Sequence, residues 1–135
     1  MIRVLLVDDS PSVRAVLKRF FRKTPDIQVV GEAADGAEAV QAVIDLQPQV
    51  VVMDLHMPVL DGYQATEQIM AVRPTPIIVL SSRANRNQMT IAFEAMRRGA
   101  VEVVIISRSC FGPQSLRKSL LRQALKGPKK PHRVV

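Results

Sequence analysis

Cysteine is almost absent from this chain of 135 residues, and long apolar runs are missing altogether. The one cysteine, Cys110, excludes an internal disulfide and is typical of a reducing compartment, so we expect a cytoplasmic protein. No apolar run approaches the roughly 18 residues that a membrane-spanning helix needs. The first residues, MIRVLLVDD, lack a signal-peptide pattern because their apolar run is short and ends in two acids. We therefore expect a soluble protein, long enough for one domain with a full core.

Negative charge is scarce in the second part of the chain. Residues 1–82 carry 7 basic and 10 acidic side chains, net −3, whereas residues 83–135 carry 12 basic and 2 acidic ones, net +10. Such a basic region can bind a polyanion, so a nucleic-acid-binding module is one alternative. That alternative rests on a basic set comprising Arg97, Arg98, Arg117, Lys118, Arg122, Lys129 and Lys130. Because these charges are not interleaved with aromatic residues or a recognisable nucleic-acid module, we favour solvated helix faces plus a basic tail, and an acidic protein partner over nucleic acid.

Short apolar runs alternate with longer segments of helical periodicity. The first run ends at Asp8-Asp9, and Ser10-Pro11 then provides a helix N-cap and a first-turn proline. The expected strands span residues 2–7, 27–33, 50–53, 77–80 and 101–106, and the expected helices follow Ser10 and Asp35 and span about residues 63–72, 87–98 and 114–125. This alternation predicts a doubly wound α/β sheet, and strands so apolar indicate parallel pairing with both faces covered.

Polar residues stand at the ends of three predicted strands: Asp8 and Asp9, Asp54, and Ser81. Ligands of open parallel sheets bind at the carboxyl ends of the strands, so we expect these residues to converge. Three carboxylates so close repel each other by about 4 kcal/mol per pair at 4 Å and an effective dielectric near 20. A cation is the expected remedy, and all-oxygen ligation suits Mg²⁺. Asp54 could then act as a phosphoryl nucleophile without a general base, because a carboxylate is already ionised.

Each of these features also has an ordinary structural explanation. Asp8-Asp9 could cap the first helix, Asp61-Gly62 could be only a turn, and Ser81-Ser82 could be loop residues. Asp54 is harder to explain in this way, because it ends a fully apolar run with no helix start directly after it. Taken together, the features favour a functional site.

Three motifs resemble the receiver domain of two-component response regulators. They are VLLVDDS at residues 4–10, VVVMDLHMPVLDG at residues 50–62 and VLSS at residues 79–82. The stretches VVGEAADGAEAV, RPTPIIVLSS and RRGAVE are most similar to the receiver of the chemotaxis methylesterase. The resemblance covers about residues 1–125. It implies a flavodoxin-like (βα)₅ fold with strand order 2-1-3-4-5.

The resemblance also implies a role for each residue at the acidic edge. Asp54 is the expected phosphoacceptor, Asp9 a direct Mg²⁺ ligand and Asp8 a ligand through water. The backbone carbonyl of His56 is expected to be a further metal ligand, and Ser81 is expected to supply the switch hydroxyl. His56 and Arg83 stand where the family varies the lifetime of the phosphoryl group.

Two positions depart from the family pattern. Receivers carry a lysine at the end of strand five, but Ile106 stands there, and no lysine occurs between Lys23 and Lys118. The aromatic switch position of strand five is held by Val103. Two hypotheses follow: a receiver that still accepts a phosphoryl group with weakened switching, or a receiver-fold module that binds its partner largely without phosphorylation.

The domain organisation follows from the same resemblance. We expect a receiver domain over residues 1–126 and a basic tail or the start of a linker over residues 127–135. No second domain or serine nucleophile with a partner histidine follows, so we expect no enzyme activity beyond the domain's own phosphorylation and dephosphorylation. The implied partners are a histidine kinase as phosphodonor and a protein effector or fused output domain. That partner is expected on the surface of the fourth helix, fifth strand and fifth helix.

Overall fold

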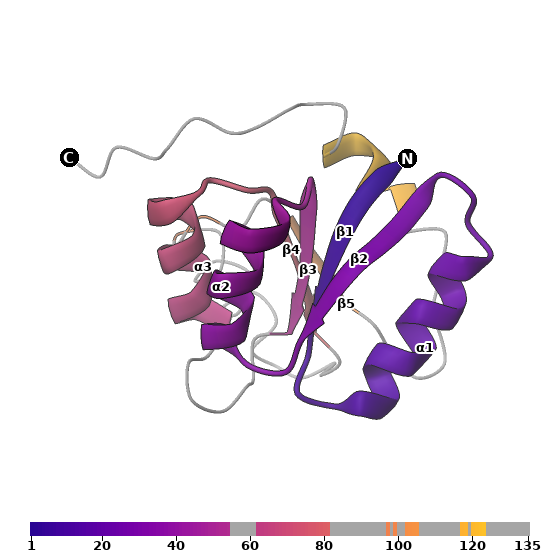
Figure 1. Cartoon of the computed structure of the whole chain (residues 1–135), viewed down its shortest axis with the longest axis horizontal. Coiled ribbons are helices and arrows are strands. Elements are labelled where there is room, and N and C mark those ends of the chain that lie inside the picture. The colour runs from indigo at the N-terminus through magenta and orange to yellow at the C-terminus, as the bar shows by residue number, and fades with distance from the viewer. Residues whose placement is uncertain are drawn as a thin grey trace.

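Five parallel strands form the centre of the molecule (Figure 1). The computed structural model describes residues 1–54, 62–81, 97, 99, 102–105, 117, 118 and 120–123, and for Ser81 and residues 102–105 it describes the backbone. The strands are β1 (Ile2–Val7), β2 (Ile27–Ala33), β3 (Val50–Asp54), β4 (Ile77–Ser81) and β5 (Glu102–Ile105). Their order is β2-β1-β3-β4-β5, and all neighbouring pairs are parallel. The predicted flavodoxin-like α/β fold is confirmed.

The first three helices are α1 (Pro11–Arg22), α2 (Gly36–Leu46) and α3 (Gly62–Val72). Helix α1 begins where the sequence predicts, because the Ser10 hydroxyl oxygen accepts a hydrogen bond from the Val13 amide at 3.3 Å. Residues 117, 118 and 120–123 are helical, inside the predicted segment 114–125. The predicted helix 87–98 lies outside the described residues apart from Arg97. Within the described part of the chain, no helix is long and apolar enough to cross a bilayer.

The apolar strands bury both faces of the sheet. One face packs on α2 and α3 through Leu5, Val7, Val51, Met53, Ile77, Val79, Ala39, Val43, Ala65 and Ile69. The other face packs on α1 and the C-terminal helical residues through Val4, Leu6, Val50, Val52, Ile78, Leu80, Leu17, Phe21 and Leu120. Figure 1 shows α1 on one side of the sheet and α2 and α3 on the other. Successive residues of a strand point to opposite faces, which explains the near-continuous apolar runs.

Two apolar residues of α1 that share the helical spacing lie at the surface. Leu17 and Phe21 are buried, but Val13 and Val16 are 40% and 52% exposed. A helix turns by about 100° per residue, so Val16 points roughly 120° away from the direction midway between Leu17 and Phe21. Val13 lies in the first turn, before the buried stripe begins. The buried stripe of α1 is therefore narrower than its apolar pattern.

The first residues of β1 are tied to the end of α2 by Arg3. Its Nη1 donates to the Gln47 carbonyl at 2.8 Å, and its Nη2 donates to the Leu46 carbonyl at 2.5 Å. Gln47 ends the helix in the left-handed region, with φ of 49°. The Arg3 amide donates to Gln49 Oε1 at 2.9 Å, and the Gln49 amide donates to the Arg3 carbonyl at 2.8 Å. These contacts fix the amino end of β1.

Strand β2 contains one residue more than its partner. Val4 of β1 pairs with Val29, but the next residue, Leu5, pairs with Gly31. Val30 is thus the extra residue of a β-bulge. The bulge lies in an edge strand, since β2 is the first strand of the sheet.

Candidate functional site

Three acidic residues come together at the carboxyl ends of two neighbouring strands. Asp8 and Asp9 directly follow β1, and Asp54 is the last residue of β3. The strands are parallel and Val7 pairs with Met53, so the residues after this pair meet at the same edge. One carboxylate oxygen from each of Asp8, Asp9 and Asp54 lies within 4.8 Å of the others. The sequence-based expectation that these acids converge therefore describes the geometry found.

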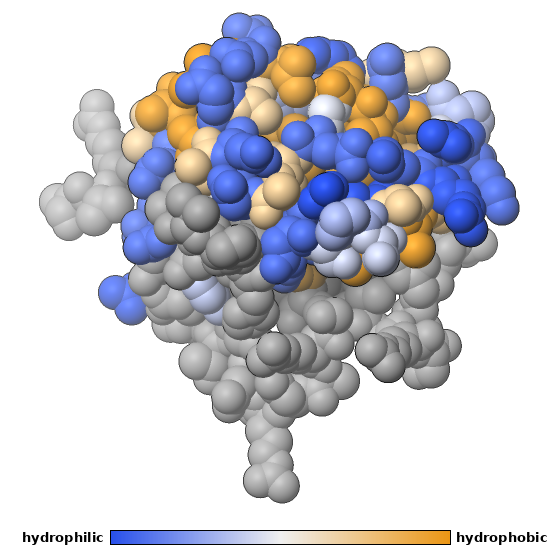
Figure 2. Space-filling view, turned by 60° about the horizontal axis from the view of Figure 1, so that its bottom comes forward, coloured by the Kyte–Doolittle hydropathy of each residue, from blue (hydrophilic) through white to orange (hydrophobic). Residues whose placement is uncertain are grey.

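The lower edge of the sheet in Figure 1 is the end towards which β1 runs. Figure 2 turns this side of the molecule forward, and hydrophilic residues predominate on its described part, with smaller hydrophobic patches between them. Asp8 is buried, at 7% exposure, Asp54 is half-buried and Asp9 is exposed. The acidic site is thus open on the side of Asp9 and closed on the side of Asp8.

Asp8 is held on its backbone and on its side chain. Its amide donates to the Ala33 carbonyl at 3.1 Å, and its Oδ1 accepts a hydrogen bond from the Ser10 amide at 2.9 Å. The pKa of Asp8 is raised from its ordinary value of 3.8 to about 6, chiefly by burial and further by the negative charges of Asp54 and Asp9, while the Ser10 hydrogen bond lowers it. A bound cation would offset both causes of this shift. The three carboxylates therefore form a donor set that a cation would stabilise.

Ser81 ends β4 at the same edge of the sheet. Leu80 pairs with Asp54, so the backbone of Ser81 lies one residue further along, where it pairs with Ile105 of β5. This backbone position agrees with a polar group beside Asp54. The role of the Ser81 hydroxyl stays a prediction.

Three of the expected site residues, His56, Arg83 and Ile106, lie outside the described residues. Their expected roles as carbonyl ligand, modulators and replacement for the lysine stay predictions. Val103, at the aromatic switch position, lies in β5, where its backbone pairs with Val79.

Arg14 is a residue near the acids that the sequence reasoning missed. Its Nη1 donates a short hydrogen bond to the Asp8 carbonyl, and its Nε donates to Glu32 Oε1 at 3.2 Å. Long side chains of a helix point back towards its N-terminus, and the N-terminus of α1 begins just after Asp9. The position of Arg14 in the first turns of that helix is the signal that could have indicated this contact.

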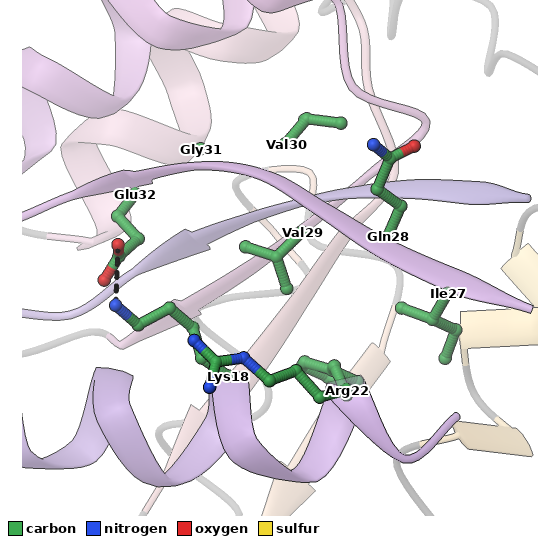
Figure 3. A pocket seen from close by; sticks show the side chains of 9 residues that line it. Lys18, Arg22, Ile27, Gln28, Val29, Val30, Gly31 and Glu32 are labelled. Carbon is green, nitrogen blue, oxygen red and sulfur yellow. Dashed lines mark hydrogen bonds and ion pairs between the residues drawn. The ribbon is translucent and has the colours of Figure 1, made fainter. Parts of the chain in front are cut away.

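A pocket of about 370 Å³ lies between α1 and β2 (Figure 3). Its lining consists of Lys18, Phe21, Arg22, Ile27, Gln28, Val29, Val30, Gly31 and Glu32. Figure 3 shows Lys18 from the helix and Glu32 from the strand meeting across it, with Nζ and Oε2 3.1 Å apart. None of the three aspartates lines this pocket. It is therefore separate from the acidic site.

Comparison with known proteins places this geometry in a family. The sequence of residues 4–109 matches the family model of the response regulator receiver domain. A protein-glutamate methylesterase/protein-glutamine glutaminase of Geobacter metallireducens is 46% identical over 101 residues, which cover 75% of this chain and 29% of that protein. The protein of the same name from Thermotoga maritima is 46% identical over 104 residues, which cover 77% of this chain and 30% of that protein. The chain thus spans less than a third of the length of these curated relatives.

Solved structures give the same result. The response regulator domain of Thermotoga maritima CheB superposes with a TM-score of 0.75 at 39% identity, covering 94% of this chain and 96% of that one. The receiver domain of a Pseudomonas aeruginosa sensor histidine kinase, with a magnesium ion coordinated in its active-site cleft, superposes with a TM-score of 0.77 at 28% identity. That match covers 91% of this chain and 97% of the other.

The comparisons correct one expectation. The sequence led us to expect no enzyme, but the curated relatives are named as enzymes, so this prediction is contradicted. The similarity to them falls within the receiver segment. The prediction failed because the matched segment is a minor part of each relative. The lack of a catalytic domain within these residues was therefore not evidence about enzyme function.

Proposed function

Because the chain belongs to the response regulator receiver domain family, we propose that it accepts a phosphoryl group on Asp54 from a histidine kinase. The observation that carries this proposal is the convergence of Asp8, Asp9 and Asp54, with carboxylate oxygens within 4.8 Å of one another. Structure alone gives no reason to gather like charges at this distance. A site that binds a cation and accepts a phosphoryl group does give a reason to bring these carboxylates together.

The donor set fits Mg²⁺. Carboxylate oxygens are hard ligands, and Mg²⁺ is usually held by one or two of them together with water. We assign Asp9 as a direct ligand, Asp8 as a ligand through water, Asp54 as a ligand shared with the phosphoryl group and the His56 carbonyl as a further ligand. The raised pKa of Asp8 supports this assignment, because it reflects burial and negative neighbours that a divalent cation would compensate. Bound Mg²⁺ would neutralise negative charge and orient the phosphoryl oxygens.

The transfer itself needs little from the protein beyond position. A carboxylate oxygen of Asp54 forms a bond to the phosphorus of a phosphohistidine donor, and the phosphorus–nitrogen bond breaks with its electron pair going to the imidazole. Asp54 needs no general base, since the carboxylate is the nucleophile. Ser81, at the end of β4, would donate its hydroxyl hydrogen to a phosphoryl oxygen.

The named relatives suggest which process phosphorylation of this chain would control. Since the segments most similar to this chain belong to protein-glutamate methylesterases, we propose that its phosphorylation controls such an output in chemotaxis. We place the docking surface on the fourth helix, β5 and the fifth helix, where the basic charge is concentrated. Lys118 and Arg122 are exposed there, and Arg117, which is also exposed, pairs with Asp26 at 3.0 Å. Docking steered by such charges should weaken with added salt.

Phosphorylation with acetyl phosphate and Mg²⁺ tests the proposal. Intact-mass spectrometry should find one added phosphoryl group on the unmodified protein and none on Asp54→Asn. Asp45→Asn is the matched control, since this exposed carboxylate lies on α2 away from the acidic site. Beryllofluoride with Mg²⁺ should give a second, independent adduct that also requires Asp54.

The opposite result has a defined meaning. If neither reagent forms an adduct that depends on Asp54, the phosphoacceptor assignment is wrong. The chain would then be a receiver-fold module that binds its partner without phosphorylation. The feature of the sequence that would favour that second function is Ile106, which the family resemblance aligns with the lysine at the end of strand five.

A further inference from the structure

Arg14 connects the acidic site to the edge of the sheet. Its Nη1 donates to the Asp8 carbonyl and its Nε donates to Glu32 Oε1, so one guanidinium bridges the end of β1 and the edge strand β2. Glu32 also pairs with Lys18, which fixes the carboxylate from a second side, as Figure 3 shows. The Arg14 side chain is only 17% exposed. It is therefore held in place from two directions and shielded from solvent.

We propose that Arg14 is a positioning residue for the metal-binding pair Asp8 and Asp9. This inference rests on the proposed function, because it concerns how the proposed magnesium ligands are held. Arg14 would not touch the metal or the phosphoryl group. It acts through the peptide group that joins the two acids.

The physical basis is the planarity of that peptide. The Asp8 carbonyl belongs to the peptide bond between Asp8 and Asp9, and the atoms of a peptide unit, including both Cα atoms, lie in one plane. A hydrogen bond that holds the carbonyl therefore fixes the orientation of this plane and limits the directions in which the two side chains can leave the backbone. The Asp8 amide is held by the Ala33 carbonyl at 3.1 Å, so Arg14 provides the matching restraint on the other side of Asp8.

Arginine suits this position better than lysine. The guanidinium is planar and carries several N–H groups in fixed directions, so Nη1 and Nε can serve two acceptors at once. A lysine ammonium is a single point on a flexible stem and cannot span both partners with the same geometry. Outer partners of metal ligands commonly change metal affinity about 10- to 100-fold when they are removed.

Charge and positioning predict opposite results when Arg14 is replaced. A cation near the site repels Mg²⁺, so if charge alone mattered, Arg14→Met would bind Mg²⁺ more tightly and Arg14→Lys would behave like the unmodified protein. If Arg14 positions the acids, both variants should bind Mg²⁺ about tenfold more weakly. The sign of the change thus separates the two roles.

The experiment is a titration of each variant of the 135-residue chain with MgCl₂, in which amide NMR shifts report binding. Lys18→Ala is the matched control, because it removes a cation from Glu32 but leaves both contacts of Arg14. Glu32→Gln is a second variant that keeps an oxygen acceptor for Arg14, and it should weaken Mg²⁺ binding only a few-fold. Thermal unfolding of each protein without metal checks that it is folded.

A second readout uses phosphorylation by acetyl phosphate at increasing Mg²⁺. Positioning of the metal ligands predicts that the Arg14 variants need about tenfold more Mg²⁺ but approach the unmodified rate at saturation. Unchanged or tighter Mg²⁺ binding in both Arg14 variants would overturn the inference while leaving the proposed function intact. Failure of the unmodified protein to bind Mg²⁺ would overturn the proposed function, and this inference with it.

Discussion

Two arginines hold opposite ends of β1 by the same kind of contact. Arg3, at the amino end, donates to the carbonyls of Leu46 and Gln47, where α2 ends. Arg14, at the carboxyl end, donates to the carbonyl of Asp8 and to Glu32. The partners at the amino end carry no reactive group, whereas the peptide held at the carboxyl end joins two proposed metal ligands. The chemistry of the partners, and not the kind of contact, separates the structural role of Arg3 from the positioning role that we propose for Arg14.

Removing magnesium should affect only the acidic site at the carboxyl end of β1, and it should give the largest of the expected effects. Chelation with EDTA is expected to slow phosphorylation of Asp54 by about a hundredfold or more, since the charge of the transferred phosphoryl group loses its main compensation. The rate of labelling by acetyl phosphate measures this. Added Mg²⁺ should restore the rate, and a rate insensitive to both EDTA and Mg²⁺ would contradict a metal-dependent site.

Arg3→Ala should remove contacts only at the amino end of β1 and should therefore change stability but not Mg²⁺ binding. Losing two hydrogen bonds from a charged donor is expected to lower the free energy of unfolding by about 2 kcal/mol. Urea unfolding measures the stability, and a Mg²⁺ titration of the same variant should match that of the unmodified protein. Weaker Mg²⁺ binding by Arg3→Ala would mean that the two ends of β1 are coupled, and the distinction between the two arginines would fail.

Asp8→Asn should stabilise the metal-free protein, in contrast to Arg3→Ala. The pKa of Asp8 in the folded protein is raised from 3.8 to about 6, so between these pH values the folded state binds more protons than the unfolded state. The free energy of unfolding therefore falls as the pH rises through this window, and the destabilising charge is fully present only above it. Asparagine keeps an oxygen for the Ser10 amide and removes this charge.

The measurement is urea unfolding of Asp8→Asn and the unmodified protein at two pH values without metal. At pH near 8 the variant should be more stable by about 1 kcal/mol, discounted for solvent screening, and at pH near 4 the difference should nearly vanish. Asp45→Asn, on the exposed side of α2, is the control for removing a carboxylate away from the acidic site. A gain of the same size at both pH values would exclude the raised pKa as its cause.

Gln47→Gly, at the end of α2 that contacts the amino end of β1, should give the smallest change in the free energy of unfolding. Gln47 has φ of 49°, a left-handed conformation that glycine adopts without strain from a side chain. We expect an increase of about 0.5 kcal/mol in the free energy of unfolding, because glycine's loss of chain entropy partly cancels the gain. Gln41→Gly, in the interior of α2, should instead lower it by about 1 kcal/mol.

Most of the fold could be predicted because its signals are local. The apolar run of β1 and the Ser10-Pro11 start of α1 fix both elements within a few residues of the chain. The meeting of Asp8 and Asp54 needed one further rule, that parallel strands bring their carboxyl ends to the same edge. Neither step depends on how particular side chains pack.

The supporting contacts could not be predicted because they depend on packing between distant segments. The bridge from Arg14 to Glu32 requires the angle at which α1 lies on β2, and no periodicity in either segment reports it. The raised pKa of Asp8 depends on burial by the finished fold. The exposure of Val13 and Val16 likewise reflects where the helix meets the sheet, which the apolar pattern of α1 alone does not specify.

The bulge at Val30 determines the register of the β2 residues that follow it. Leu6 pairs with Glu32 and Val7 with Ala33 only because Val30 is skipped in the ladder. If Val30 instead took part in the ladder, Glu32 would pair with Val7, and the alternation of side chains would turn Glu32 to the α2 side of the sheet, out of reach of Arg14. Deleting Val30 would remove the bulge but keep Glu32 opposite Leu6, whereas losing the bulge with Val30 in place would shift the rest of β2 by one residue. Strand register alone can thus decide whether a chemically intact sequence keeps the Arg14 contact beside the acidic pair.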